Sequence, residues 1–115
     1  MQPHIPFSAA DLKRAARVPF RGGPLTRAGR ALQKHRPSDR PSSPYPEPSG
    51  NPQQVNRQAQ QIIDEILDDP ASTFSIATRM FHGQPVQYIQ IQPPSPDRRL
   101  VRFDINGNFL TFLET

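Results

Sequence analysis

The stretch NPQQVNRQAQQIIDEILDDP, residues 51–70, predicts the longest helix of the chain. Asn51 is a good N-cap, and Pro52 suits the first helical position because its missing N–H has no partner there. The apolar residues recur at the spacing of one helix face: Val55, Ala59, Ile62, Ile63, Ile66 and Leu67. Asp69 precedes Pro70, which disfavours helical geometry before it. We therefore expect an amphipathic helix that ends at this point.

After Pro70 the apolar period changes from helical to the alternation of strands. We expect strands over residues 72–78, 86–92, 100–105 and 108–113. In the third, Val101, Phe103 and Ile105 would share the core face and Arg102 and Asp104 the other. Asn106-Gly107 predicts a tight hairpin turn. The predicted fold class is α+β: an amphipathic helix packed on a small antiparallel sheet of about four strands, preceded by a basic, partly helical N-terminal segment.

The half before this helix divides into three parts. Residues 1–23 form a basic tail with a short helix over 9–18, begun by a capping box of Ser8 and Asp11. Residues 24–35 form a second short basic helix. Residues 36–51 are a linker rich in proline and serine that only Tyr45 could anchor. Within it, we expect residues 36–49 to make the fewest core contacts. Residues 52–115 are the expected core of helix and sheet.

The charge of the chain is unevenly distributed. Its 115 residues hold 14 Lys and Arg against 10 Asp and Glu, a net charge of +4. Residues 1–50 hold nine basic groups against three acidic ones, and only two of the 14 cations are lysine. The planar fork of arginine suits bidentate phosphate contact. Two interpretations remain open on charge alone: a solvated basic tail and a nucleic-acid surface.

The predicted long helix crowds four acids at its C-terminal end: Asp64, Glu65, Asp68 and Asp69. Negative charge there is unfavourable because the helix dipole is already negative at that end. We expect a basic partner, either the N-terminal arginines or another chain.

Several functional classes are excluded by composition. The chain has no cysteine, so it has no disulfide, no thiolate metal site and no cysteine nucleophile, and it lacks the zinc deaminase signature. No apolar run approaches the roughly 18 residues of a membrane span, and no signal peptide is recognised. There is no phosphate-binding glycine loop, serine elbow or HExxH motif. The three histidines are scattered, so we expect no metal and no cofactor.

RNA cleavage without a metal needs a base near the 2′-hydroxyl, cations on the phosphorane and an acid for the leaving oxygen. His35 is the best base candidate, because a histidine titrates near neutral pH and Lys34, Arg30 and Arg36 flank it. The alternative is a surface histidine at a frayed helix end. His82, beside Gly83, is a weaker acid candidate and is otherwise an ordinary turn residue.

The remaining candidates lie on or near the predicted strands and the second short helix. Arg79 and Arg102 could act on the phosphate, although Arg102 could instead pair with Asp104 or Glu114. The predicted substrate-binding residues are Arg27, Arg30, Arg36, Arg99 and Thr111.

Several short motifs occur in one order along the chain. They are LTRAGRALQKH at 25–35, GNP at 50–52, IDEIL at 63–67, DRRLVRFD at 97–104, NG at 106–107 and FLE at 112–114. Together they resemble the C-terminal toxin domains of bacterial polymorphic toxins of the Rhs and filamentous-haemagglutinin type. The resemblance covers roughly residues 24–115. It departs from the pattern at Arg98 and Leu100, which replace glycines, and at Thr111 and Thr115, which replace glycine and proline.

The resemblance implies a nuclease of the compact ribonuclease group that includes barnase, RelE and the colicin tRNA-cutting domains. Carried over by position, His35, Lys34, Arg79 and Arg102 would be the functional residues. It implies an RNA substrate, either tRNA or rRNA, cut through a 2′,3′-cyclic phosphate, and a cognate immunity protein. It further implies a secreted or delivered effector that acts in the target-cell cytoplasm.

Two other hypotheses remain open on the residues. One is a non-catalytic interaction module whose basic N-terminal arm orders on a partner. The other is a nucleic-acid binder without chemistry, which the sequence supports less because Tyr45 and Tyr88 lie too far apart to form an evident stacking platform.

Overall fold

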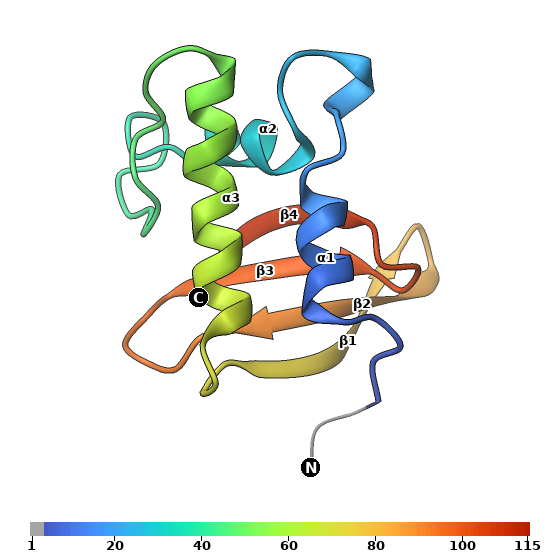
Figure 1. Ribbon diagram of the computed structural model, residues 1–115. Helices are drawn as coiled ribbons and strands as arrows, with labels where there is room; N and C mark the ends of the chain where they lie inside the picture. Colours follow the sequence, from blue (N-terminus) through green and yellow to red (C-terminus); the bar gives the residue numbers. More distant parts are fainter. Residues whose placement is uncertain (1–3) are drawn as a thin grey trace.

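A four-stranded antiparallel sheet is the base of the fold in the computed structural model, which describes residues 4–115 (Figure 1). The strands follow one another in the order β1-β2-β3-β4. Helices α1 and α3 lie over one face, and α2 lies beside β4. The predicted α+β class is confirmed. The elements are α1 Ala9–Ala16, the 3-10 turn η1 Phe20–Gly22, α2 Arg27–Lys34, α3 Pro52–Asp68, β1 Thr73–Phe81, β2 Gln84–Gln92, β3 Arg99–Asp104 and β4 Phe109–Glu114.

Helix α3 begins and packs as its sequence predicts. The side chain of Asn51 accepts the N–H of Gln54 at 2.9 Å, and the side chain of Gln54 accepts the N–H of Asn51 at 2.8 Å. This reciprocal cap satisfies N–H groups that a helix start leaves free. The six predicted apolar residues are the buried ones: Val55, Ala59, Ile62, Ile63, Ile66 and Leu67.

Two of the four acids at the end of α3 are paired with cations of the same chain. Lys13 of α1 contacts Asp68 at 2.6 Å, and Arg99 of β3 contacts Glu65 at 3.1 Å. The expected basic partner is therefore internal, with one cation from the N-terminal segment and one from the sheet.

The strands present their apolar residues to the helices on one face, which we call the core face. Its buried side chains are Ile89, Ile91, Val101, Phe103, Phe109 and Phe112. In β4 the two phenylalanines are three residues apart, a spacing that a regular strand would place on opposite faces. The pairing shifts here: Arg102 pairs with Thr111, but Phe103 pairs with Phe109. Leu110 is therefore a bulge residue without a partner, and the bulge turns both rings inward.

Ile105 was predicted on the core face, and the structure corrects this. It lies in the β3–β4 turn and is 45% exposed. Asp104 closes the turn by accepting the N–H groups of Asn106 and Asn108, and Gly107 has a positive φ of 89°. The connection is thus a three-residue loop with glycine in the left-handed region, rather than the predicted two-residue turn.

The short N-terminal helices belong to the same core as α3 and the sheet. Leu12 and Ala16 of α1 and Leu32 of α2 are fully buried. Both helices are shorter than predicted, but the capping box of Ser8 and Asp11 is confirmed. A Cβ on Gly29 would lie 2.3 Å from Asn56 Oδ1, so a larger residue would displace the Asn56 side chain, which accepts the N–H of Thr26.

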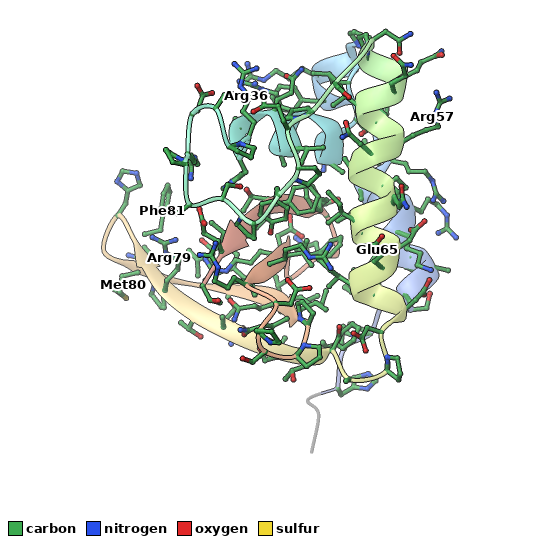
Figure 2. All side chains as sticks on the ribbon, turned by 90° about the vertical axis from the view of Figure 1, so that its left-hand side faces the viewer. Arg36, Arg57, Glu65, Arg79, Met80 and Phe81 are labelled. Carbon is green, nitrogen blue, oxygen red and sulfur yellow. The ribbon has the colours of Figure 1, made fainter. Side chains whose placement is uncertain are left out.

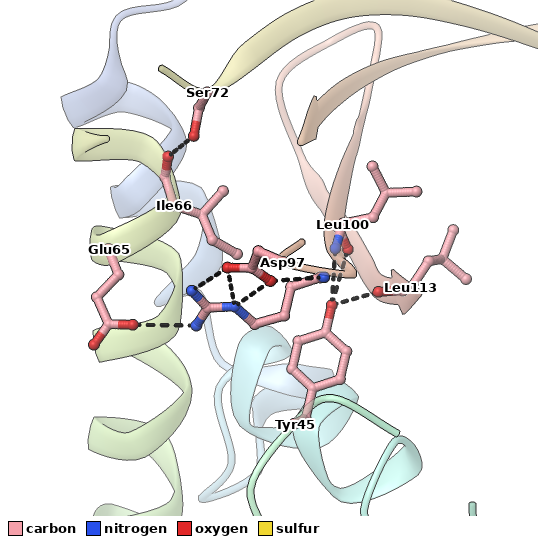
Figure 3. A network of polar contacts seen from close by, with 8 residues as sticks. Tyr45, Glu65, Ile66, Ser72, Asp97, Leu100 and Leu113 are labelled. Carbon is pink, nitrogen blue, oxygen red and sulfur yellow. Dashed lines mark hydrogen bonds and ion pairs between the residues drawn. The ribbon is translucent and has the colours of Figure 1, made fainter. Parts of the chain in front are cut away.

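Residues 36–50 contain no helix or strand and cross the end of the sheet as a strap. Tyr45 anchors the strap and is only 2% exposed. Its hydroxyl accepts the N–H of Leu100 at 3.1 Å and also contacts the carbonyls of Leu100 and Leu113 (Figure 3). Burial raises the pKa of Tyr45, which keeps this hydroxyl protonated. The strap thus ties α2 to the last two strands.

Candidate active site

His35 lies at the C-terminal end of α2 and is 4% exposed. Its N–H donates to the carbonyl of Leu32, and its own carbonyl accepts the hydroxyl of Ser43 from the strap. The imidazole meets the ring of Tyr45 edge-on, with centroids 6.0 Å apart. The alternative of a frayed surface histidine is therefore wrong, because the strap and the cap hold this ring in place.

One edge of the imidazole faces β4. His35 Nε2 lies 3.4 Å from Thr111 Oγ1, and that hydroxyl is also 2.8 Å from the carbonyl of Phe112. His35 Nδ1 is buried and has no hydrogen-bond partner among residues 4–115. The hydroxyl of Thr111 has one proton, which it can donate either to the carbonyl of Phe112 or to His35 Nε2. If the hydroxyl donates to the carbonyl, Oγ1 can only accept from Nε2–H; if it donates to Nε2, the neutral ring carries its proton on Nδ1. The tautomer of the ring therefore decides whether Nε2 is the donor or the acceptor.

The surroundings of His35 favour its neutral form. Burial lowers its pKa, and the positive charges of Arg40 and Lys34 lower it further, while Glu114 opposes them. A histidine with a pKa below 6.5 is uncharged at neutral pH, which is the form a general base requires.

A cleft of about 490 Å³ opens between η1, α2 and β4, next to the His35–Thr111 pair. Four of its lining residues are cations and none is a carboxylate. The lining consists of Phe20, Arg21, Arg27, Arg30, Ala31, Lys34, Phe109, Leu110 and Thr111. The composition suits an anionic ligand with an apolar part.

The ion pairs of residues 4–115 do not involve the cations of the cleft. Six of the ten acids form ion pairs, and their partners are Lys13, Arg14, Arg36, Arg98 and Arg99. Within residues 4–115, Arg27, Arg30 and Lys34 have no carboxylate at ion-pair distance. Their charge is thus available to a ligand. Two of the predicted binding residues are held elsewhere, because Arg36 contacts Asp39 and Arg99 contacts Asp97 and Glu65 (Figure 3).

Arg102 lies beside Thr111 on the face of the sheet opposite the helices, which we call the open face. The two residues are cross-strand partners, so their side chains share a face. Arg102 Nε donates to Gln90 Oε1 at 3.0 Å, and its Cζ lies 5.5 Å from the centroid of the Tyr88 ring. It does not pair with Asp104 or Glu114; the latter faces Arg98 at 3.9 Å. A hydrogen bond and a cation–π contact thus orient the guanidinium.

Arg79 and His82 lie away from the cleft, at the β1 edge of the sheet and at the β1–β2 turn. Arg79 is on β1, at the edge farthest from β4, although it shares the open face with Arg102. His82 is exposed at the β1–β2 turn with a φ of 50°, and its ring contacts Phe81. The structure therefore gathers His35, Lys34, Arg27, Arg30, Thr111 and Arg102, and leaves Arg79, His82, Arg36 and Arg99 outside this group.

Sequence reasoning missed Arg21 and Gln90. Arg21 reaches the cleft from η1, where it stacks on Phe20 at 5.0 Å. No local signal marks Gln90, because its role follows from strand register. Within the described part of the chain, no group of three or more His, Asp or Glu is placed to hold a metal. None of the helices described has the length and apolarity to span a membrane.

Residues 13–114 match the model of one protein family, the CdiA C-terminal tRNase toxin domain. The match includes both ends of the site, His35 and Thr111. Searches of the curated proteins and of the solved structures found no match.

Proposed function

The chain belongs to the family of CdiA C-terminal tRNase toxin domains, and on this premise we propose that it cuts tRNA without a metal, with His35 as general base. The family makes it a polymorphic-toxin nuclease that cleaves RNA. The observation that carries the finer proposal is the His35–Thr111 contact, placed next to a cleft whose cations lack carboxylate partners.

The proposed reaction is an internal transesterification. Neutral His35 takes the proton of a 2′-hydroxyl that replaces Thr111 Oγ1 beside Nε2. The 2′ oxygen attacks the phosphorus and the bond to the 5′ oxygen breaks. Lys34 donates the proton to that oxygen, because the arginines of the cleft cannot release one. The products are a 2′,3′-cyclic phosphate and a 5′-hydroxyl.

The arginines would stabilise charge in this reaction. Arg27 and Arg30 lie three residues apart on α2 and line the cleft, while Arg102 approaches from the open face. Cations fixed before the reaction stabilise the phosphorane without reorganising in the transition state. The orienting contacts of Arg102 to Gln90 and Tyr88 support this role.

The same charges suggest how the toxin is neutralised. Domains of this family are delivered into target cells, and we propose that this one acts in their cytoplasm. A cognate immunity protein would cover the cleft with carboxylates, which complement its unpaired cations.

The deciding experiment incubates the protein with total tRNA, with and without EDTA, and identifies the fragment ends. We expect discrete fragments with cyclic phosphate ends that persist in EDTA. His35→Ala should lower the rate by about 10²–10⁴-fold, the usual contribution of a general base. His4→Ala removes an exposed histidine of the tail and is the matched control. Cleavage abolished by EDTA, or a fully active His35→Ala variant of native fold, would overturn the proposal.

A further inference from the structure

The β1–β2 hairpin carries an exposed aromatic residue that the proposed reaction does not use. We propose that Phe81 stacks on an unpaired nucleobase of the RNA while Arg79 contacts the adjoining phosphate. The proposal rests on RNA being the ligand, as in the proposed function. It assigns the hairpin a role in choosing which unpaired nucleotides are bound.

The hairpin is apolar at its tip and carries no negative charge. Phe81 is 60% exposed and Met80 63%. Residues 70–96 contain no Asp or Glu. Arg79 is exposed, and none of the ion pairs among residues 4–115 involves it. An exposed ring beside a free cation, in a segment that carries no acid, is complementary to an aromatic polyanion.

Strand register places Phe81 on the side of the candidate site. Arg79 and Phe81 are two residues apart and therefore share a face, whereas Met80 points to the other one. Figure 2 shows Met80 directed away from Phe81. Counting along the pairs, the face of Phe81 is the open face that holds Tyr88, Arg102 and Thr111.

The open face thus presents two aromatic rings, each close to an arginine. Tyr88 is partnered by Ala77, four residues before Phe81 on the same strand, a separation of about 13 Å along β1. Tyr88 carries Arg102 over its ring, and Phe81 has Arg79 two residues away. This repeated pairing of ring and cation is typical of surfaces that bind single-stranded nucleic acid by stacking.

Substitution of Met80 distinguishes a nucleobase from a protein as the ligand of the hairpin tip. Met80 is nearly as exposed as Phe81 but lies on the opposite face, so binding that depended only on exposed apolar surface at the tip would lose affinity at either residue. A nucleobase bound on the open face would contact Phe81 alone. The charge around the tip favours the second case.

The test measures binding of the whole protein to a single-stranded RNA octamer in which every ribose is 2′-O-methylated and one base is 2-aminopurine. This RNA cannot undergo the proposed reaction, so binding is measured apart from cleavage. We expect Phe81→Ala to weaken binding by about 5–150-fold, the range for loss of one stacked base. Phe81→Trp should bind within twofold of the wild type. Met80→Ala is the matched control and should also stay within twofold.

Two results would overturn the inference. One is equal affinity of the wild type and Phe81→Ala, or no binding by either. The other is an equal loss in Met80→Ala, which would indicate an apolar docking surface. Phe81-dependent binding in a protein that fails to cut tRNA would refute the proposed reaction alone. Circular dichroism confirms the fold of each variant.

Discussion

The two faces of the sheet differ although the same strands make both. On the core face, Phe103 and its neighbours are sealed under α1 and α3. On the open face, Arg102 and Thr111 remain half-buried and polar. Phe103 and Arg102 are consecutive residues, so a single peptide bond separates a packing role from a proposed catalytic one. The alternation of side chains between the two faces of each strand therefore forms the core and also positions the candidate site.

The largest expected effect comes from the core face. Phe103→Ala should lower the free energy of unfolding by about 3–5 kcal/mol, because it removes a fully buried ring and leaves a cavity. Urea unfolding of the purified variant measures this loss. Phe103→Leu should lose less because it leaves a smaller cavity. A Phe103→Ala variant as stable as the wild type would contradict the division between the two faces.

Substitution of Arg102, the residue before Phe103, should lower activity and leave stability nearly unchanged. Arg102→Ala should lower kcat for tRNA cleavage by about 10²–10³-fold, the usual cost of losing one transition-state donor, and leave the unfolding midpoint nearly unchanged. Arg57→Ala removes an exposed arginine of α3 and is the charge-matched control. A similar loss of activity in both variants would mean that general positive charge, and not the position of Arg102, matters.

Tyr45 joins the strap to the sheet, and its substitution measures how much this contact stabilises the fold. Tyr45→Phe should lower the free energy of unfolding by about 1–3 kcal/mol, because the buried N–H of Leu100 loses its partner. Tyr88→Phe, whose ring is only half-buried, should have a smaller effect. Thermal unfolding of the two variants decides this, and equal midpoints would contradict the anchoring role.

The smallest effect is a pH dependence of stability. The pKa of His35 is lowered by folding, so below pH 6.5 the unfolded chain binds more protons than the folded one. Stability from this group is complete above pH 6.5 and falls as the pH drops towards the folded pKa, by at most about 1.4 kcal/mol per pH unit. Urea titrations should show a shallower dependence in His35→Gln than in the wild type and in His4→Ala. The same dependence of stability on pH in all three proteins would contradict this prediction.

The parts predicted from sequence are those with a local signal. The caps at Asn51 and Ser8 and the apolar face of α3 follow from residues within four positions of one another. The bulge at Leu110 and the exposure of Ile105 depend on pairing between strands, which alternation alone does not reveal. The Phe81 and Tyr88 pair was missed for the same reason. His35 was recognised by its residue type, but its contact with Thr111 spans 76 positions.

That last separation has a consequence for synthesis. A chain is made from its N-terminus, so His35 is complete long before Thr111 exists. Tyr45 likewise cannot make its contacts to the strands until Leu100 and Leu113 have been synthesised. No nascent chain that ends before Thr111 contains the pair, and β4 is the strand that completes it. The order of translation therefore postpones the proposed activity until β4 has been made.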